Sequence, residues 1–192
     1  WLNAGSRITY SQGFGVGNRK IELIGEGYFE VKRNEEVPFL VKTNSLLVKV
    51  LGTKFNFRDY PDDAEAIVSL SEGKVALNNL LKKEKEAFLL PNERVVLNKK
   101  NGRMHVEYST VSNALQWTNG YLFFDEELLP DVVKELERSY NVKIQIASDT
   151  LNTFRFYGNF VHREQNIQEV LEALSATRKI HYIIEGHNIT LY

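Results

Sequence analysis

Short runs of alternating apolar and polar residues fill the chain from residue 8 to about residue 106. Residues 28–32 and 46–50 show the two-residue period of a half-buried strand, and turn-forming residues such as Asn34 and Pro61 separate the runs. Asn101 followed by Gly102 predicts a hairpin turn of type I′. We therefore expect roughly ten strands in this half, arranged as a β-sandwich or a short β-solenoid.

The period changes after residue 111. Apolar residues then recur at spacings of three and four over residues 129–140 and 167–174, which predicts two amphipathic helices. Alternating runs flank the helices at residues 121–124, 142–146, 156–160 and 180–184, and residues 189–191 are a candidate further strand. The pattern predicts a small α+β domain of β-α-β-β-α-β order over residues 113–192, after a β-rich domain over residues 1–112.

The two helical segments match each other at a constant offset of 38 positions, without a gap. The matched hydrophobic pairs are Leu129 with Ile167, Val132 with Val170, Val133 with Leu171, Leu136 with Leu174, Val142 with Ile180, Ile144 with Tyr182, and Ile146 with Ile184. Duplication of one β-α-β unit and convergence of two such units both account for the match. Both predict the same fold.

Composition narrows the class of partner. The 24 basic and 25 acidic residues nearly cancel, so the chain lacks the positive field that attracts nucleic acid or an anionic membrane. The absence of cysteine excludes disulfides and thiolate metal sites. The chain has no run of about 18 apolar residues and begins at Trp1 without a leader. We therefore expect any membrane segment of the protein to lie outside these residues.

Catalytic and phosphate-binding motifs are missing. Gly13, Gly15 and Gly17 alternate as in a phosphate-binding loop, but residues 19–23 continue as a strand where that motif needs a helix. A surface loop is the better interpretation. No Gly-x-Ser-x-Gly elbow occurs, and no histidine is placed to suggest a triad. We therefore expect that the chain is not an enzyme and that it has no catalytic residue and no cofactor.

Metal ligands at a usable spacing are also missing. The four histidines are His105, His162, His181 and His187. The last two are the pair best placed to meet, across the final hairpin, but no second type of ligand accompanies them. Asp59, Asp62 and Asp63 surround Pro61 and lack the pattern of a calcium loop, so a polar turn explains them. We expect no metal site.

Aromatic residues are the main candidates for a binding surface. The chain has 11 Phe, 9 Tyr and 2 Trp, many of them on expected strands. Their alternation fits core positions, but aromatic residues on both faces of one strand, as in residues 154–160, leave one face for a partner. The expected partner-binding residues are Leu46, Val48, Val50, Phe55, Phe57, Phe154, Phe156, Tyr157 and Phe160.

Five phrases of the β-rich half resemble the FecR family of anti-sigma factors and occur in that family's order. They are residues 2–6 (LNAGS), 25–31 (GEGYFEV), 38–43 (PFLVKT), 50–57 (VLGTKFNF) and 70–75 (LSEGKV). Residues 117–120, 136–142 and 156–160 resemble the C-terminal domain of Bacteroidetes-type members, which is similar to the short N-terminal domain of secretins and TonB-dependent transducers. Pro91-Asn92-Glu93 stands where the family usually has Pro-Gly-Glu. Because Asn tolerates a left-handed backbone, we expect the turn to be kept.

The resemblance implies the periplasmic, signal-receiving region of a single-pass inner-membrane protein. The implied partner is the signalling domain of an outer-membrane TonB-dependent transporter, and a part outside these residues would hold an extracytoplasmic-function sigma factor. The resemblance implies transmembrane signalling and transcription regulation, without a small-molecule substrate. Two alternatives stay open on the residues alone: a carbohydrate-binding β-domain and a structural periplasmic spacer.

Overall fold

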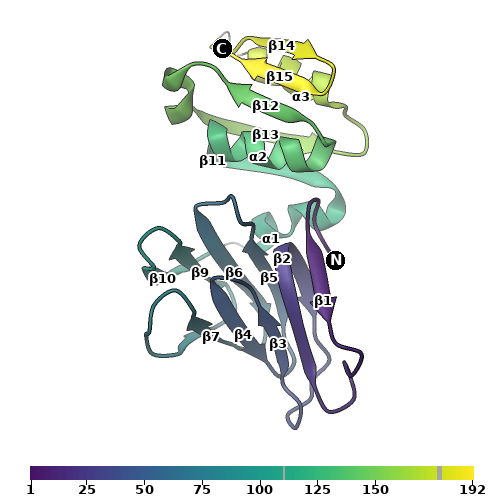
Figure 1. Ribbon diagram of the computed structural model, residues 1–192, viewed down its shortest axis with the longest axis vertical. Helices are drawn as coiled ribbons and strands as arrows, with labels where there is room; N and C mark the ends of the chain where they lie inside the picture. Colours follow the sequence, from purple (N-terminus) through teal and green to yellow (C-terminus); the bar gives the residue numbers. More distant parts are fainter. Residues whose placement is uncertain (110, 177–178) are drawn as a thin grey trace. The chain divides into compact units, whose positions relative to one another are not determined.

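Ten strands of the computed structural model correspond to the alternating runs in the first half of the chain (Figure 1). The structure describes residues 1–109, 111–176 and 179–192, and the chain divides into two units, Trp1–Leu115 and Gln116–Tyr192. The strands of the first unit are β1 (Arg7–Tyr10), β2 (Arg19–Glu30), β3 (Phe39–Lys42), β4 (Leu46–Val50), β5 (Lys54–Asp59), β6 (Glu65–Glu72), β7 (Val75–Asn79), β8 (Ala87–Leu89), β9 (Glu93–Asn98) and β10 (Met104–Tyr108). The short helix α1 (Val111–Ala114) follows β10.

These strands form one sheet of order β10-β9-β6-β5-β2-β3-β4-β7-β8, and β1 pairs with β2. The β2–β3 pair is parallel, and the other pairs of neighbouring strands that share a register are antiparallel over the described residues. The sheet folds back on itself, so that β3, β4 and β7 face β5, β6 and β9 across one apolar core (Figure 1). The arrangement resembles a sandwich rather than a solenoid, because a solenoid stacks repeated parallel strands.

Strand β2 is 12 residues long and belongs to both layers. Its residues 19–22 pair with β3, and its residues 25–30 pair with β5. Near the junction, Gly25 has a φ of +99°, and a Cβ at this position would lie 2.4 Å from the hydroxyl oxygen of Ser6. Only glycine fits this position without strain.

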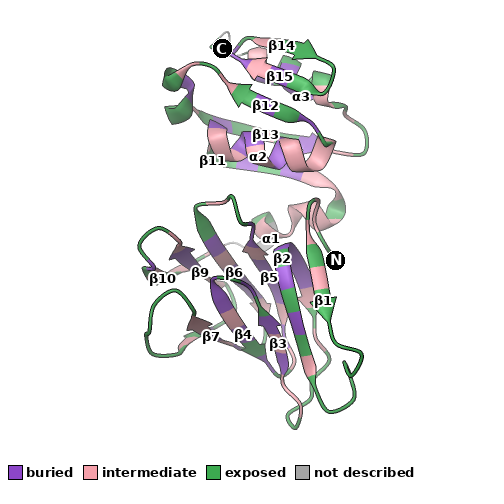
Figure 2. Ribbon diagram, viewed as in Figure 1, coloured by how far each residue is buried: buried purple, intermediate pink, exposed green. Residues whose placement is uncertain are grey.

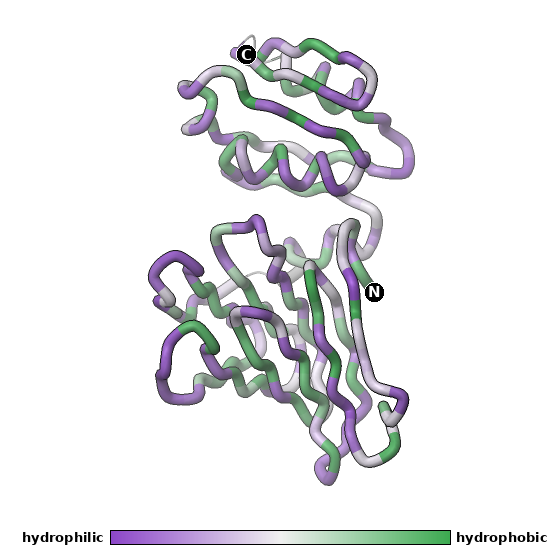
Figure 3. Tube along the Cα trace, in the orientation of Figure 1, coloured by the Kyte–Doolittle hydropathy of each residue, from purple (hydrophilic) through white to green (hydrophobic). Residues whose placement is uncertain are grey.

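The alternation that predicted the strands is visible as hydrophobic and hydrophilic positions along the first unit (Figure 3). The predicted type I′ turn at Asn101 and Gly102 is wrong. The connection between β9 and β10 is longer: Gly102 has a positive φ, whereas Asn101 does not. The side chain of Asn98 shapes the turn by accepting hydrogen bonds from the backbone amides of Lys100 and Asn101. At the β8–β9 turn, Asn92 has a φ of 66°, so the expected left-handed conformation is confirmed.

The second unit contains both predicted helices. Its elements are η1 (Gln116–Asn119), β11 (Tyr121–Leu128), α2 (Leu129–Tyr140), β12 (Lys143–Ile146), η2 (Asp149–Thr153), β13 (Arg155–Val161), α3 (Ile167–Ser175), β14 (Tyr182–Glu185) and β15 (Asn188–Leu191). Strands β11 and β13 pair with each other, and β12, β15 and β14 form a three-stranded sheet. The helices and both sheets share one apolar core.

Local sequence explains where the two helices begin and end. Pro130 stands in the first turn of α2, and Asn141 ends that helix with a left-handed φ of 52°. Helix α3 begins with a capping box, in which Asn166 and Glu169 exchange side-chain-to-backbone hydrogen bonds. Of the matched positions of the 38-residue offset, all except Ile184 belong to the core of this unit or pack against it, and Figure 2 shows buried positions along α2.

Candidate protein-binding site

Five of the expected contact residues lie in the core of the first unit. They are Leu46, Val48, Val50, Phe55 and Phe57, each at most 1% exposed. They alternate along β4 and β5, and the face that they share points into the fold. Their side chains are therefore core residues, and a partner does not reach them in this structure.

The remaining four expected contact residues lie in the second unit, and two of them are also core. Phe156 and Phe160 are 6% and 5% exposed and stack on each other with ring centroids 6.2 Å apart. Phe154 is half-buried, whereas Tyr157 is exposed, and its hydroxyl hydrogen-bonds to the carboxylate of Glu126. This hydrogen bond, with a smaller effect of desolvation, raises the pKa of Tyr157. Of the nine residues, Tyr157 is the one that presents most of its side chain to solvent.

A buried acid that sequence analysis did not select joins three of the FecR-like phrases. Glu26 is 4% exposed; its Oε2 accepts a hydrogen bond of 2.9 Å from the Asn3 amide, and its Oε1 accepts one of 2.7 Å from the Asn56 amide. The guanidinium of Arg58 lies 3.7 Å from Oε2. The network fixes the segment before β1 to β2 and β5. Its members other than Arg58 were visible in the sequence only as parts of the phrases in residues 2–6, 25–31 and 50–57.

The aspartates around Pro61 form ion pairs. Asp59 is buried beside Lys99, with its Oδ1 2.6 Å from the ammonium nitrogen, and Asp63 accepts a hydrogen bond of 2.8 Å from Arg58. Among the residues that the structure describes, no group of three or more His, Asp and Glu side chains is placed to hold a metal ion. The acidic residues therefore stabilise a turn and the adjacent strands.

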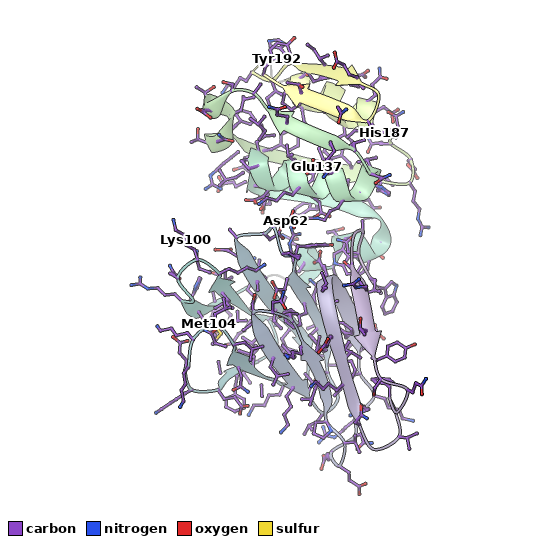
Figure 4. All side chains as sticks on the ribbon, viewed as in Figure 1. Asp62, Lys100, Met104, Glu137, His187 and Tyr192 are labelled. Carbon is purple, nitrogen blue, oxygen red and sulfur yellow. The ribbon has the colours of Figure 1, made fainter. Side chains whose placement is uncertain are left out.

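The last two histidines do not meet across the final hairpin. His181 exchanges backbone hydrogen bonds with Tyr192, whereas His187 lies at the tip between β14 and β15 (Figure 4). The glycine-rich segment before β2 is an exposed loop. A groove of about 780 Å³ beside this loop is lined in part by Arg19 and Lys20. The Arg19 guanidinium already donates to three backbone carbonyls, those of Val37, Lys32 and Asn34, so it is not available to hold an anion.

Exposed apolar side chains gather on two strands at sheet edges. In β10, Val106 is 44% and Tyr108 87% exposed. In β14, Ile183 is 51% and Ile184 41% exposed. Each strand pairs on one side only among the described residues. Edges of this kind can accept a further strand from another chain.

Comparison with known proteins identifies the family. A family model described as FecR protein matches residues 1–76, and one described as FecR, C-terminal matches residues 121–191. Two crystal structures of a candidate anti-sigma factor from Parabacteroides distasonis ATCC 8503, at 1.65 and 2.50 Å resolution, are similar to the whole chain. Both are 33% identical in sequence, cover 100% of this chain and match with TM-scores of 0.88 and 0.87 over 88% and 87% of their own chains. The chain belongs to the FecR family of anti-sigma factors.

Membership of the FecR family indicates a regulatory, non-enzymatic role that involves a sigma factor and a signalling partner. Members of this family are typically membrane-anchored and have a periplasmic region. In the part of the chain that the structure describes, none of the helices has the length and apolar character needed to cross a membrane. Comparison with curated proteins gives no match.

Proposed function

We propose that this chain is the periplasmic, signal-receiving region of a membrane-anchored FecR-type anti-sigma factor. In this role it binds the signalling domain of an outer-membrane TonB-dependent transporter and relays the signal to an extracytoplasmic-function sigma factor. The observation that carries the proposal is the 33% identity, over the whole chain, to a candidate anti-sigma factor of closely similar structure.

In this proposal the chain consists of two domains. Residues 1–112 form the FecR-like domain, and residues 113–192 form a domain similar to the short N-terminal domain of secretins and TonB-dependent transducers. The two family matches, to residues 1–76 and 121–191, fall on either side of this boundary. Separate apolar cores in the two halves also support the division.

The surface chemistry suits recognition of a protein. The apolar residues Val106 and Tyr108, which are 44% and 87% exposed, lie on an edge strand, where main-chain hydrogen bonds and side-chain contacts to a partner form together. In the groove beside β2, the guanidinium of Arg19 already donates hydrogen bonds to three backbone carbonyls. Binding through a surface therefore fits these residues better than binding in a pocket.

Isothermal titration calorimetry tests the proposal. The chain is titrated with the recombinant signalling domain of the TonB-dependent transporter whose gene neighbours its own, and with the signalling domain of an unrelated transporter as control. Specific binding of the first domain is the expected result. Absence of binding, together with specific binding on a glycan array, would replace the proposal with a carbohydrate-binding role. Absence of both, with signalling preserved after residues 1–112 are exchanged for another folded domain, would indicate a spacer.

A further inference from the structure

Among the residues that the structure describes, no strand pairs with the outer side of β10. The amide of Asn98 donates to the Arg103 carbonyl, and the amide of Ser109 donates to the Asn92 carbonyl. In an antiparallel pair the bonded residues alternate, so the odd-numbered residues of this strand bond to β9. The backbone amide and carbonyl groups of Met104, Val106 and Tyr108 consequently face outward, and no described strand pairs with them.

The side chains of the same three residues form an apolar strip at this edge. Met104 packs against the core of the first unit, and Val106 and Tyr108 continue the strip into solvent, at 44% and 87% exposure. Proteins usually protect an edge with charged side chains, above all lysine, with a proline or with a bulge. The residues of β10 include no lysine or proline, its one acidic residue, Glu107, is paired with Arg94 of β9, and its register with β9 is continuous.

Positive charge lies at one end of the strand. Lys100 extends from the hairpin tip before β10 (Figure 4), and Arg103 immediately precedes the strand. Both are exposed, and neither forms an ion pair with a described residue. Lys82 also lies close by, because a Cβ added at Gly102 would be 3.4 Å from its Cβ, but its ammonium is 3.0 Å from the carboxylate of Glu84, so the positive charge available to a partner is that of Lys100 and Arg103. An acidic residue on an incoming segment would therefore be favoured at this end.

We propose that β10 is the edge to which the signalling partner adds a strand. The occupant is an extended segment of the partner with apolar residues at alternate positions and an acidic residue at the end beside Lys100 and Arg103. It would hydrogen-bond to Met104, Val106 and Tyr108 and cover the apolar strip. This inference rests on the proposed function and specifies the surface that performs it.

The other edge strands of the ten-stranded sheet offer fewer residues for pairing with a partner. Strand β8 has 3 residues and β1 has 4, against 5 in β10. In the second unit, the reciprocal backbone bonds between His181 and Tyr192 leave only Tyr182 and Ile184 of β14 facing outward. Strand β14 therefore serves as the matched control edge.

A proline substitution tests the edge without disturbing the sheet. Val106→Pro removes an outward amide that makes no bond to β9, and proline is tolerated in an edge strand at such positions. Binding of the transporter's signalling domain, measured by calorimetry, should weaken at least about tenfold, the equivalent of 1.4 kcal/mol. The control Ile184→Pro removes an outward amide of β14 and should bind within about twofold of the unmodified chain.

Charge reversal tests the orientation of the segment. The double substitution Lys100→Glu and Arg103→Glu should weaken binding and reverse its dependence on salt. The control makes the same change in charge at Lys20 and Lys49, which are exposed on the other layer of the sheet. It should leave the affinity unchanged.

Amide hydrogen exchange in the unmodified chain gives an independent result if Val106→Pro unfolds. Formation of the complex should slow exchange at Val106 and Tyr108, and not at Ile184. Unchanged exchange at Val106 and Tyr108 in the complex, or full binding by a folded Val106→Pro chain, would overturn the inference while the proposed function stands. Absence of any complex with the unmodified chain would instead overturn the proposed function, and the inference with it. A dimer that Val106→Pro dissociates, with partner binding intact, would identify a second copy as the occupant and also overturn the inference.

Discussion

Glu26 accepts hydrogen bonds from the side-chain amides of Asn3 and Asn56 at a position that is 4% exposed. Glu26→Ala would remove both hydrogen bonds to the carboxylate, and a hydrogen bond to a charged group contributes about 1.5–3 kcal/mol. We expect the free energy of unfolding, measured with urea, to fall by at least that amount. Glu22→Ala changes an exposed acid of the same strand and should stay within about 0.5 kcal/mol of the unmodified chain. Equal effects of the two substitutions would contradict a structural role for the Glu26 network.

Tyr140 gives the second unit a dependence on alkaline pH. Burial, with a smaller contribution from Glu169, raises its pKa above the ordinary value of 10.0, and its hydroxyl donates a hydrogen bond of 3.1 Å to the Gln165 carbonyl. A raised pKa in the folded state means that its contribution to stability is complete below pH 10.0 and is lost as the pH rises through the folded pKa.

The comparison that isolates this effect is with Tyr140→Phe, which lacks the ionisable hydroxyl. Between about pH 9 and about pH 11, the stability of the unmodified chain should fall more than that of Tyr140→Phe. Urea unfolding at both pH values measures the difference. Parallel losses in the two proteins would show that other groups cause the alkaline destabilisation.

At the scale of elements, the β8–β9 turn depends on one left-handed residue. Asn92 has a φ of 66°, a conformation that glycine adopts freely, asparagine tolerates and alanine resists. Asn92→Ala should therefore lower the melting temperature, with a cost of about 1–2 kcal/mol, whereas Asn92→Gly should not. A melting temperature of Asn92→Ala equal to that of Asn92→Gly would show that backbone conformation does not limit this turn.

Periodicity predicted where the helices and strands lie more accurately than it predicted which of their faces are buried. The three- and four-residue spacing located α2 and α3, because each helix buries one apolar stripe. The alternation in Leu46, Val48 and Val50 correctly placed these residues on one face of a strand. It could not show that this face lies inside the fold, because that depends on how the sheet folds over itself. The expected binding residues were therefore mostly core residues.

The β9–β10 connection shows the limit of turn signals. The Asn101-Gly102 pair indicated a hairpin correctly, but the side chain of Asn98 lengthens the turn by bonding to two backbone amides. Likewise, the edge of β10 could not be located from the sequence. Its position depends on pairings between strands that are far apart in the chain.

At the scale of the whole molecule, each unit has its own apolar core. A chain that ends at Leu115 should therefore unfold cooperatively by itself. If β10 is the contact, this shortened chain should still bind the signalling domain measurably, which calorimetry can determine. Complete loss of binding by a shortened chain that still unfolds cooperatively would place the essential contact in the second unit.

The family, by contrast, is recognisable in the amino-acid sequence alone. Phrases such as residues 25–31 and 50–57 keep their order along the chain, and the structure shows that Glu26 and Asn56 from these two phrases are bonded to each other. Sequence phrases of this kind are determined by how their residues pack and hydrogen-bond inside the fold. They identify the fold without indicating which surface a partner uses.

Strand β2, shared by both layers, has a consequence for the rate at which the first unit folds. Neither layer can be completed before β2 is in place, and its partner β5 lies well downstream in the sequence. Folding dominated by such non-local pairing takes about milliseconds to seconds. A newly made chain therefore passes through an interval in which strands other than β10 are also unpaired and can pair with strands of other proteins. Chaperone assistance would matter most in that interval.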